Sequence, residues 1–240
     1  MAHFLRGARP SPRHRLAAAA PHVATTPTPA QWLWNPKQLS MWLNDQDGDC
    51  VTAEEAFAKG CGPKGVFITD ATVLAWATKN NVLNGTDLTT VLDLMQTAGF
   101  PQDDNLYDDG SPLSVDWTNA AVLENAIGLG PVKIGVAADQ LENAVNAGPT
   151  QANGNPANGW VATGFTKDSN EDHCVSLCGF GSSAWLASQL GVVDPEIPGT
   201  PYALFTWGSI GIIDVPSMLA ITGEAWRRNP TTLIAAQGAL

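Results

Sequence analysis

The sequence predicts an α+β fold, in which a mostly helical half precedes a half built mainly of strands. In the first half, apolar residues recur at helical spacing, as in the run from Leu88 to Met95. The second half contains an alternating stretch, 131–136, and two apolar runs, 173–180 and 202–207, which are typical of strands. The chain has 240 residues, of which 44% are hydrophobic, so it can bury a sizeable core in one or two domains.

Residues that favour helix ends set the expected boundaries of the first three helices. Thr and Asp side chains accept hydrogen bonds from the free N–H groups of a first helical turn, and glycine commonly ends a helix. We therefore expect helices over residues 50–59 between Asp49 and Gly60, over 70–80 after Thr69, and over 87–98 between Thr86 and Gly99.

The second half is expected to mix helices with its strands. The predicted helices span residues 119–127, 139–147 and 214–228, and Asp214 caps the last of them. Residues 151–159 are rich in Asn, Gly and Pro, which indicates a loop. A run of helices followed by a strand-rich segment is the pattern of an α+β protein.

Charge is distributed unevenly along the chain. Residues 31–240 carry 8 basic and 23 acidic side chains, whereas residues 1–30 carry no acidic side chain and four arginines, Arg6, Arg9, Arg13 and Arg15. Because the Pro- and Ala-rich segment 1–30 has no periodic apolar face, we interpret it as a basic arm that is flexible or becomes ordered only in an assembly. Residues 31–240 are expected to form one domain, with a helical lobe over about 31–115 and a β-rich lobe over about 116–240.

The composition argues against several classes of protein. No apolar run approaches the ~18 residues of a membrane span, so an integral membrane protein is excluded. The net charge of −11 argues against nucleic-acid binding, except through the basic arm. Four cysteines are too few for a disulfide framework, and the N-terminus lacks the long apolar core of a signal peptide. An intracellular or virion-associated protein is therefore favoured over a secreted one.

Two residues suggest nucleophilic catalysis. Asp49 would place Cys50 in the first turn of a helix, where free N–H groups and the helix dipole favour the thiolate. A cysteine nucleophile needs a base within hydrogen-bond reach, and His173 is the only histidine outside the arm. If the strand that begins at His173 pairs antiparallel with the strand that precedes Trp207, these two side chains lie close together.

Four segments follow one another along the chain: 44–58 around the cysteine, 123–136 (LENAIGLGPVKIGV), 172–181 (DHCVSLCGFG) and 206–208 (TWG). Together they resemble the papain-like cysteine peptidases, in which a nucleophilic Cys opens a helix, a His begins a strand and a Trp shields the His. The resemblance covers roughly residues 40–210, and 123 positions separate Cys50 from His173, close to the spacing in such enzymes. It implies a papain-like two-lobed fold with an N-terminal helical lobe and a C-terminal antiparallel β lobe.

The resemblance also implies supporting residues, and the chain departs from the pattern. Asn44 stands where these peptidases have the Gln of the oxyanion hole, and Gln46 is an alternative donor. Phe205 stands in place of the Asn that orients the His, so either Thr206 substitutes for it or the site is a Cys–His dyad. Glu54, one helical turn after the cysteine, would disfavour its thiolate. Only about 30 residues precede the expected fold, so a prosegment of the usual size is absent.

These features predict a cysteine peptidase or amidase that acts on a polypeptide or another amide without a cofactor. Cys50 would attack the carbonyl carbon as a thiolate, and His173 would act as the general base. The alternative is a non-catalytic papain-like protein that serves as a structural or binding component of a larger assembly, such as a virion or a phage particle. Phe205 at the position of the orienting Asn favours this alternative, and the basic arm would contact the assembly partner.

Two metal-binding hypotheses fit the sequence less well. Segment 45–49 (DQDGD) resembles the start of a calcium loop, but the glycine and glutamate that such a loop requires are displaced by one residue. His173 is expected to point to the opposite face of a strand from Cys174 and Cys178, which argues against a shared zinc ion. We therefore expect no metal.

Overall fold

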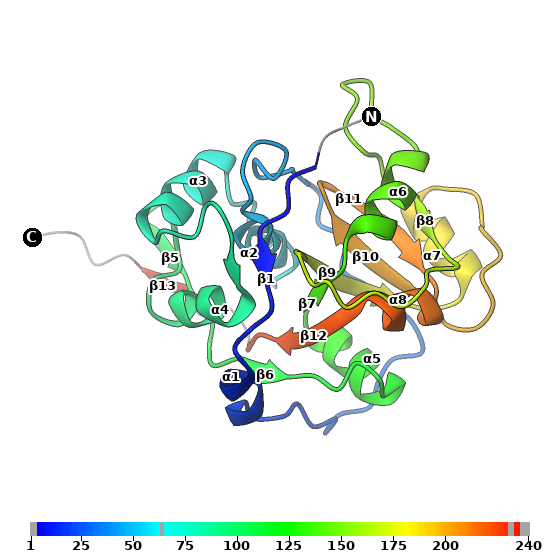
Figure 1. The fold of residues 1–240 in the computed structure, drawn as a ribbon, viewed down its shortest axis with the longest axis horizontal. Helices are drawn as coiled ribbons and strands as arrows, with labels where there is room; N and C mark the ends of the chain where they lie inside the picture. Colours follow the sequence, from blue (N-terminus) through cyan, green and yellow to red (C-terminus); the bar gives the residue numbers. More distant parts are fainter. Residues whose placement is uncertain (1–3, 63–64, 230–232, 236–240) are drawn as a thin grey trace, which may run out of the picture.

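The computed structural model describes residues 4–62, 65–229 and 233–235, and it confirms the α+β class (Figure 1). The helices are α1 (Arg13–Ala18), α2 (Cys50–Cys61), α3 (Asp70–Lys79), α4 (Leu88–Thr97), α5 (Ala120–Leu129), α6 (Asp139–Ala147), α7 (Ser183–Leu190) and α8 (Val215–Ile221). The strands are β1 (Ala8–Arg9), β2 (Trp32–Leu33), β3 (Thr86–Asp87), β4 (Phe100–Gln102), β5 (Asn105–Tyr107), β6 (Leu113–Ser114), β7 (Val132–Val136), β8 (Val161–Ala162), β9 (His173–Phe180), β10 (Tyr202–Thr206), β11 (Ser209–Ile213), β12 (Thr222–Arg227) and β13 (Leu233–Ala235).

A large sheet forms the centre of the β-rich half. Its strands follow the order β6-β12-β7-β9-β10-β11-β8, and β2 also pairs with β9. Strand β9 is buried along its whole length and runs antiparallel to both β7 and β10. Alternate residues of β9 point to opposite faces of the sheet. Helix α2 packs against one of these faces, and α5 packs against the other.

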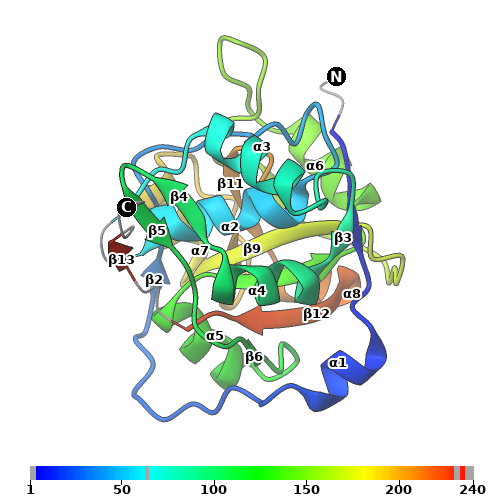
Figure 2. The same cartoon turned by 90° about the vertical axis from the view of Figure 1, so that its left-hand side faces the viewer.

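Helix α2 is the element that both halves share. Helices α3 and α4 lie on its far side from the large sheet, together with a small sheet of β4, β5 and β13 (Figures 1 and 2). Nearly all residues of α2 are buried, although its sequence includes two glutamates and a lysine. The start of this helix therefore lies deep in the molecule rather than on an open surface.

Several predicted elements are confirmed. Helix α3 follows Thr69, whose hydroxyl accepts a hydrogen bond from the N–H of Thr72, and α6 spans the predicted residues 139–147. The strand predicted over 173–180 is β9, and the run 202–207 forms β10 up to residue 206.

Three predicted boundaries are wrong. Helix α2 continues through Gly60, where a Cβ would lie 3.2 Å from the Pro36 side chain, so this glycine permits a close approach rather than ending the helix. The side chain that caps α4 is that of Asp87 rather than that of Thr86. The helix predicted over 214–228 is capped by Asp214 as expected but ends at residue 221, because the chain then forms β12 and pairs with β7 and β6.

The N-terminal segment follows a path that the sequence did not indicate. The basic arm was expected to be flexible or ordered only in an assembly, whereas residues 4–30 lie along the rest of the chain, from β1 through α1 to β2 (Figure 2). Strand β1 pairs parallel with β3, and farther on the ring of His22 lies 3.1 Å from the side-chain oxygen of Asn125. The segment is therefore in contact with both halves of the molecule.

Within the described ranges, no helix has the length and the apolar character needed to cross a membrane.

Candidate active site

Cys50 is the first residue of α2, as the sequence predicts, and it is buried with 1% of its surface exposed. The backbone of Cys174 on β9 and that of Gly7 and Ala8 in the N-terminal segment act to lower the pKa of its thiol. Burial nevertheless raises the pKa of the Cys50 thiol to about 11. The helix N-terminus alone therefore does not make this cysteine a thiolate while the segment covers it.

His173 lies at the start of β9 and is 1% exposed. Its Nε2 lies 2.8 Å from the hydroxyl oxygen of Thr206, and its ring stacks on that of Trp207 with centroids 4.3 Å apart. The antiparallel pairing of β9 and β10 brings these residues together, as the sequence predicts. The other ring nitrogen, Nδ1, has no hydrogen-bond partner in the described part of the chain. Burial and, to a smaller extent, the charge of Arg6 lower the pKa of His173 to about 3.

Phe205 occupies the position where an orienting Asn was sought. Its ring stacks on Phe57 of α2 with centroids 3.9 Å apart and packs edge-on against Trp42. Because neighbouring residues of a strand point to opposite faces, Phe205 faces the core beneath α2 while Thr206 faces His173. The hydrogen bond to the histidine ring thus comes from the next residue along β10.

Trp207 begins the tight turn between β10 and β11. It adopts φ 42°, and Gly208 follows with φ 71°. Two residues of positive φ between the paired Thr206 and Ser209 define a type I′ hairpin turn, in which a bulky residue is strained. Phe4 stacks on the other face of the Trp207 ring with centroids 4.4 Å apart, so the indole lies between Phe4 and His173. Strained residues of this kind cluster at functional sites.

The two candidate oxyanion donors lie in different surroundings. Asn44 is buried, and its side-chain N–H₂ group donates to the carbonyl oxygens of Leu5 at 3.2 Å and of Asp47 at 3.3 Å. Gln46 is exposed and borders a hollow that Asp45 and Asp70 also line. Of the two candidate donors, Asn44 is thus the one whose side chain contacts the N-terminal segment.

Residues 4–9, which we call the strap, fill the site. The N–H of Ala8 donates to the backbone oxygen of Asp172 at 3.1 Å, and the carbonyl of Gly7 accepts from the N–H of Thr86 at 2.8 Å. Gly7 lies so close to Gly48 that a Cβ on Gly7 would stand 1.6 Å from the Gly48 carbonyl oxygen. The strap therefore passes between the cysteine and solvent, and only a residue without a side chain fits at its centre.

Glu54, which was expected to disfavour the Cys50 thiolate, is neutralised by two buried cations. Its carboxylate lies 2.9 Å from Nζ of Lys133 and is also paired with Arg228. Glu55 pairs with the same two cations, at 2.9 Å from Lys133 and 2.6 Å from Arg228. The charge of Glu54 is therefore balanced beneath α2.

Asp49 precedes Cys50, but its side chain does not cap the helix. It is 1% exposed, and neither carboxylate oxygen has a hydrogen-bond partner in the described part of the chain. Burial, followed by the charges of Asp47, Asp45 and Asp70, raises the pKa of Asp49 to about 8. The folded protein therefore keeps a proton on Asp49 at pH values where the unfolded chain has lost it.

We expect Asp49→Asn to remove a pH-dependent loss of stability. Because the folded pKa of Asp49 is raised, stability falls as pH rises, by about 1.4 kcal/mol per pH unit, or roughly 4 kcal/mol between pH 5 and pH 8. The variant lacks this contribution. The free energy of unfolding in urea of the variant, minus that of the native chain, should therefore increase between pH 5 and pH 8. Asp103→Asn, at an exposed turn between β4 and β5, is the matched control. A constant difference between Asp49→Asn and the native chain at all pH values would contradict the expectation.

The residues considered for metal binding are not gathered around a common point. In the described part of the chain, no group of three His, Cys, Asp or Glu side chains is arranged to hold a metal ion. This includes segment 45–49, and also His173 with Cys174 and Cys178, all three of which are buried in β9.

Known proteins were compared by sequence and by structure. No protein-family model matches the chain, and no curated protein matches by sequence. Solved structures do match. The proform of the cysteine protease Amb a 11, a ragweed pollen allergen, has a TM-score of 0.60 at 10% identity, over 91% of this chain and 72% of that one. Xylellain, a cysteine protease from Xylella fastidiosa, has a TM-score of 0.57 at 10% identity, over 95% and 96%. The Carica candamarcensis cysteine protease CMS1MS2, in complex with E-64, has a TM-score of 0.56 at 13% identity, over 84% and 99%.

The chain therefore has the two-lobed fold of the papain-like cysteine proteases. This confirms the fold that the four sequence segments implied. At 10–13% identity, these matches establish the fold alone.

Proposed function

We propose that this protein is a papain-like cysteine hydrolase, a peptidase or an amidase, which the strap holds in a closed state. The observation that supports this proposal is the setting of His173. One ring nitrogen lies 2.8 Å from Thr206, the ring is stacked on Trp207, and the other nitrogen has no partner in the described part of the chain. A histidine that is oriented through one nitrogen and free at the other is what a cysteine nucleophile requires of its base.

The proposed reaction requires Nδ1 of His173 to come within hydrogen-bond reach of the Cys50 sulfur once the strap is displaced. Nδ1 then takes the proton of the Cys50 thiol, and the thiolate attacks the carbonyl carbon of the substrate. Asn44 and the N–H of Cys50 donate hydrogen bonds to the oxyanion. His173 then gives its proton to the leaving amine, and water hydrolyses the acyl-enzyme. In the closed state burial raises the pKa of Cys50, and burial together with the charge of Arg6 lowers the pKa of His173. Displacing the strap would reduce the burial of both groups and remove that charge.

A second candidate function is a non-catalytic component of an assembly, such as a virion. Phe205 favours it, since the position of the orienting Asn is used for core packing. The closed site favours it as well, because the strap belongs to the chain itself and covers Cys50. The two functions differ in one property, which is whether an uncovered Cys50 hydrolyses amides.

The test uses Gly7→Val, which we call the opened variant. A valine at this position cannot fit against Gly48, so it should displace the strap from the site. We expect the opened variant to hydrolyse a quenched fluorescent casein. Cys50→Ser or His173→Ala in the opened variant should lower that rate by more than ~100-fold, and Thr206→Val by about tenfold.

Cys61→Ser is the control, since Cys61 lies at the other end of α2. It should leave the rate of the opened variant unchanged within about twofold. Failure of the opened variant to hydrolyse any peptide, although iodoacetamide labels its Cys50, would favour the non-catalytic function.

A further inference from the structure

Arg6 of the strap lies among three carboxylates that the reaction does not use. Its guanidinium lies 2.9 Å from Asp172 and 2.5 Å from Glu142, and it is also paired with Asp139. Burial acts to lower the pKa of Arg6, but hydrogen bonds with Asp139, Glu142 and Asp172 raise it above its usual value. We call these three acidic residues the carboxylate cage.

The carboxylate cage is built from two elements that do not depend on Arg6. Asp139 and Glu142 lie in the first turn of α6. Asp172 immediately precedes β9, and its second oxygen accepts a hydrogen bond of 3.0 Å from the N–H of Ala138. Asp172 is thus fixed relative to the start of α6. The side chains of Glu142 and Asp172 are 24% and 27% exposed against 69% for Asp139, so the first two contribute most to binding a cation.

The arrangement matches a guanidinium better than an ammonium. One terminal nitrogen of Arg6 contacts Asp139 and Asp172, while the other contacts Glu142. Two nitrogens held in a fixed plane reach carboxylates on two sides, which the single nitrogen of a lysine does not do.

The carboxylate cage is also part of the wall of the active site. Asp172 is the neighbour of His173 in the sequence, and its backbone oxygen accepts a hydrogen bond from the N–H of Ala8. Arg6 precedes Gly7, whose backbone acts on the pKa of the Cys50 thiol and which packs against Gly48, two residues before the cysteine. Once the strap leaves, three acidic side chains face an incoming chain with no basic partner, so the vacant cage favours a cation.

We propose that the carboxylate cage of Asp139, Glu142 and Asp172 is a specificity site for an arginine side chain of a polypeptide substrate, and that Arg6 occupies it in the closed state. This proposal rests on the proposed function, because it names the substrate class of the same site. It predicts that the enzyme prefers peptides with an arginine near the bond that is cleaved.

The experiment uses the full chain with Arg6→Ala added to the opened variant. Peptides that carry arginine at successive positions are compared with otherwise identical peptides that carry citrulline, a neutral side chain of the same shape. At one position we expect kcat/KM to be about tenfold higher for arginine than for citrulline, with lysine between them. Glu142→Gln should reduce this ratio to less than about threefold.

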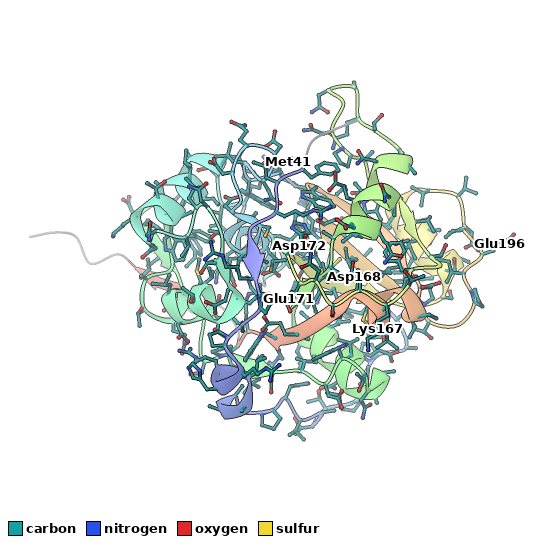
Figure 3. All side chains as sticks on the ribbon, viewed as in Figure 1. Met41, Lys167, Asp168, Glu171, Asp172 and Glu196 are labelled. Atoms are coloured by element: carbon teal, nitrogen blue, oxygen red, sulfur yellow. The ribbon has the colours of Figure 1, made fainter. Side chains whose placement is uncertain are left out.

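Glu196→Gln is the matched control, because Glu196 lies at the far edge of the molecule from the cage (Figure 3). It should leave the ratio unchanged. Hydrolysis with no preference between arginine and citrulline at any position would overturn the proposal while supporting the hydrolase.

A chain without hydrolytic activity would count against the proposed function instead. In that case, peptide binding tests whether the carboxylate cage recognises arginine. In the same background with Cys50→Ser, fluorescence anisotropy should show the labelled arginine peptide binding about tenfold more tightly than its citrulline analogue. Equal affinities would overturn the proposal.

Discussion

Gly7→Val should make Cys50 react with iodoacetamide at least ~100-fold faster at pH 7 than in the native chain. In the closed state, 1% of Cys50 is exposed and its thiol has a pKa raised to about 11. Only about one thiol in ten thousand is then a thiolate at neutral pH. A cysteine uncovered at a helix N-terminus has a pKa near or below ~8.5, which gives a few per cent of thiolate or more.

The same variant should change the pH profile of the labelling. In the native chain the rate should keep rising with pH up to about 11, because burial by the strap raises the thiol pKa to that value. In the opened variant the rise should level off below pH 9. His173→Ala in the opened variant should shift the midpoint upward, because a nearby imidazolium favours the thiolate. Mass spectrometry after timed quenching identifies which cysteine is labelled, and the other three cysteines are buried.

Two further variants show whether faster labelling results from displacing the strap. Gly130→Val is the matched control, since a Cβ at Gly130 has no neighbour within 4 Å. It should label at the native rate. Arg6→Ala leaves the Gly7–Gly48 contact intact but removes three ion pairs, so it should raise the labelling rate by a smaller factor. Native labelling rates in both Gly7→Val and Arg6→Ala would show that the strap does not control access to Cys50.

The sequence indicated that Cys50 begins a helix and that His173 and Trp207 lie close together, because local patterns determine both features. Two strand-like runs and their antiparallel pairing are visible in short windows, whereas the side chain of Asp49, which was expected to cap the helix, does not do so. The hydrogen bond between Thr206 and His173 follows from strand alternation once Phe205 is known to face α2.

The sequence did not predict the position of the strap, because each of its contacts joins one residue to a partner far away in the sequence. Phe4 meets Trp207, and Arg6 meets Asp172 across 166 positions. A Pro- and Ala-rich segment has no apolar periodicity from which such contacts could be predicted. The sequence did contain three relevant features: the isolated aromatic residue Phe4, Arg6 directly before Gly7, and the excess of acidic side chains in residues 31–240, to which an arginine can bind.

A second large effect concerns Lys133, which is 0% exposed in β7. Its Nζ lies 2.9 Å from Glu54 and 2.9 Å from Glu55, and it donates to the carbonyl of Val51 at 2.7 Å. Arg228 pairs with both glutamates from the other side. Burial acts to raise the pKa of Glu55, but Arg228 and Lys133 together lower it to about 2. Both glutamates of α2 thus depend on two cations.

Lys133→Met should destabilise the fold by roughly 3–5 kcal/mol at pH 7, because it leaves two buried carboxylates with one cation. With Lys133 present, Glu55 has a folded pKa below that of the unfolded chain, so its contribution to stability is complete above about pH 4.5 and disappears as pH falls toward 2. Without Lys133 the folded pKa rises, so the deficit should be larger at pH 7 than at pH 4.5. Urea unfolding of both chains at the two pH values measures this difference.

A compensating change separates lost charge balance from lost packing. Glu54→Gln added to Lys133→Met removes the excess negative charge and should recover about half of the lost stability, although Glu54→Gln alone should destabilise the native chain. Lys167→Met, at an exposed position (Figure 3), should change stability by less than about 0.5 kcal/mol. No recovery in the double variant would mean that Lys133 acts through its contact with Val51. In that case its part in the fold is to hold the first turn of α2, and with it Cys50, against the sheet.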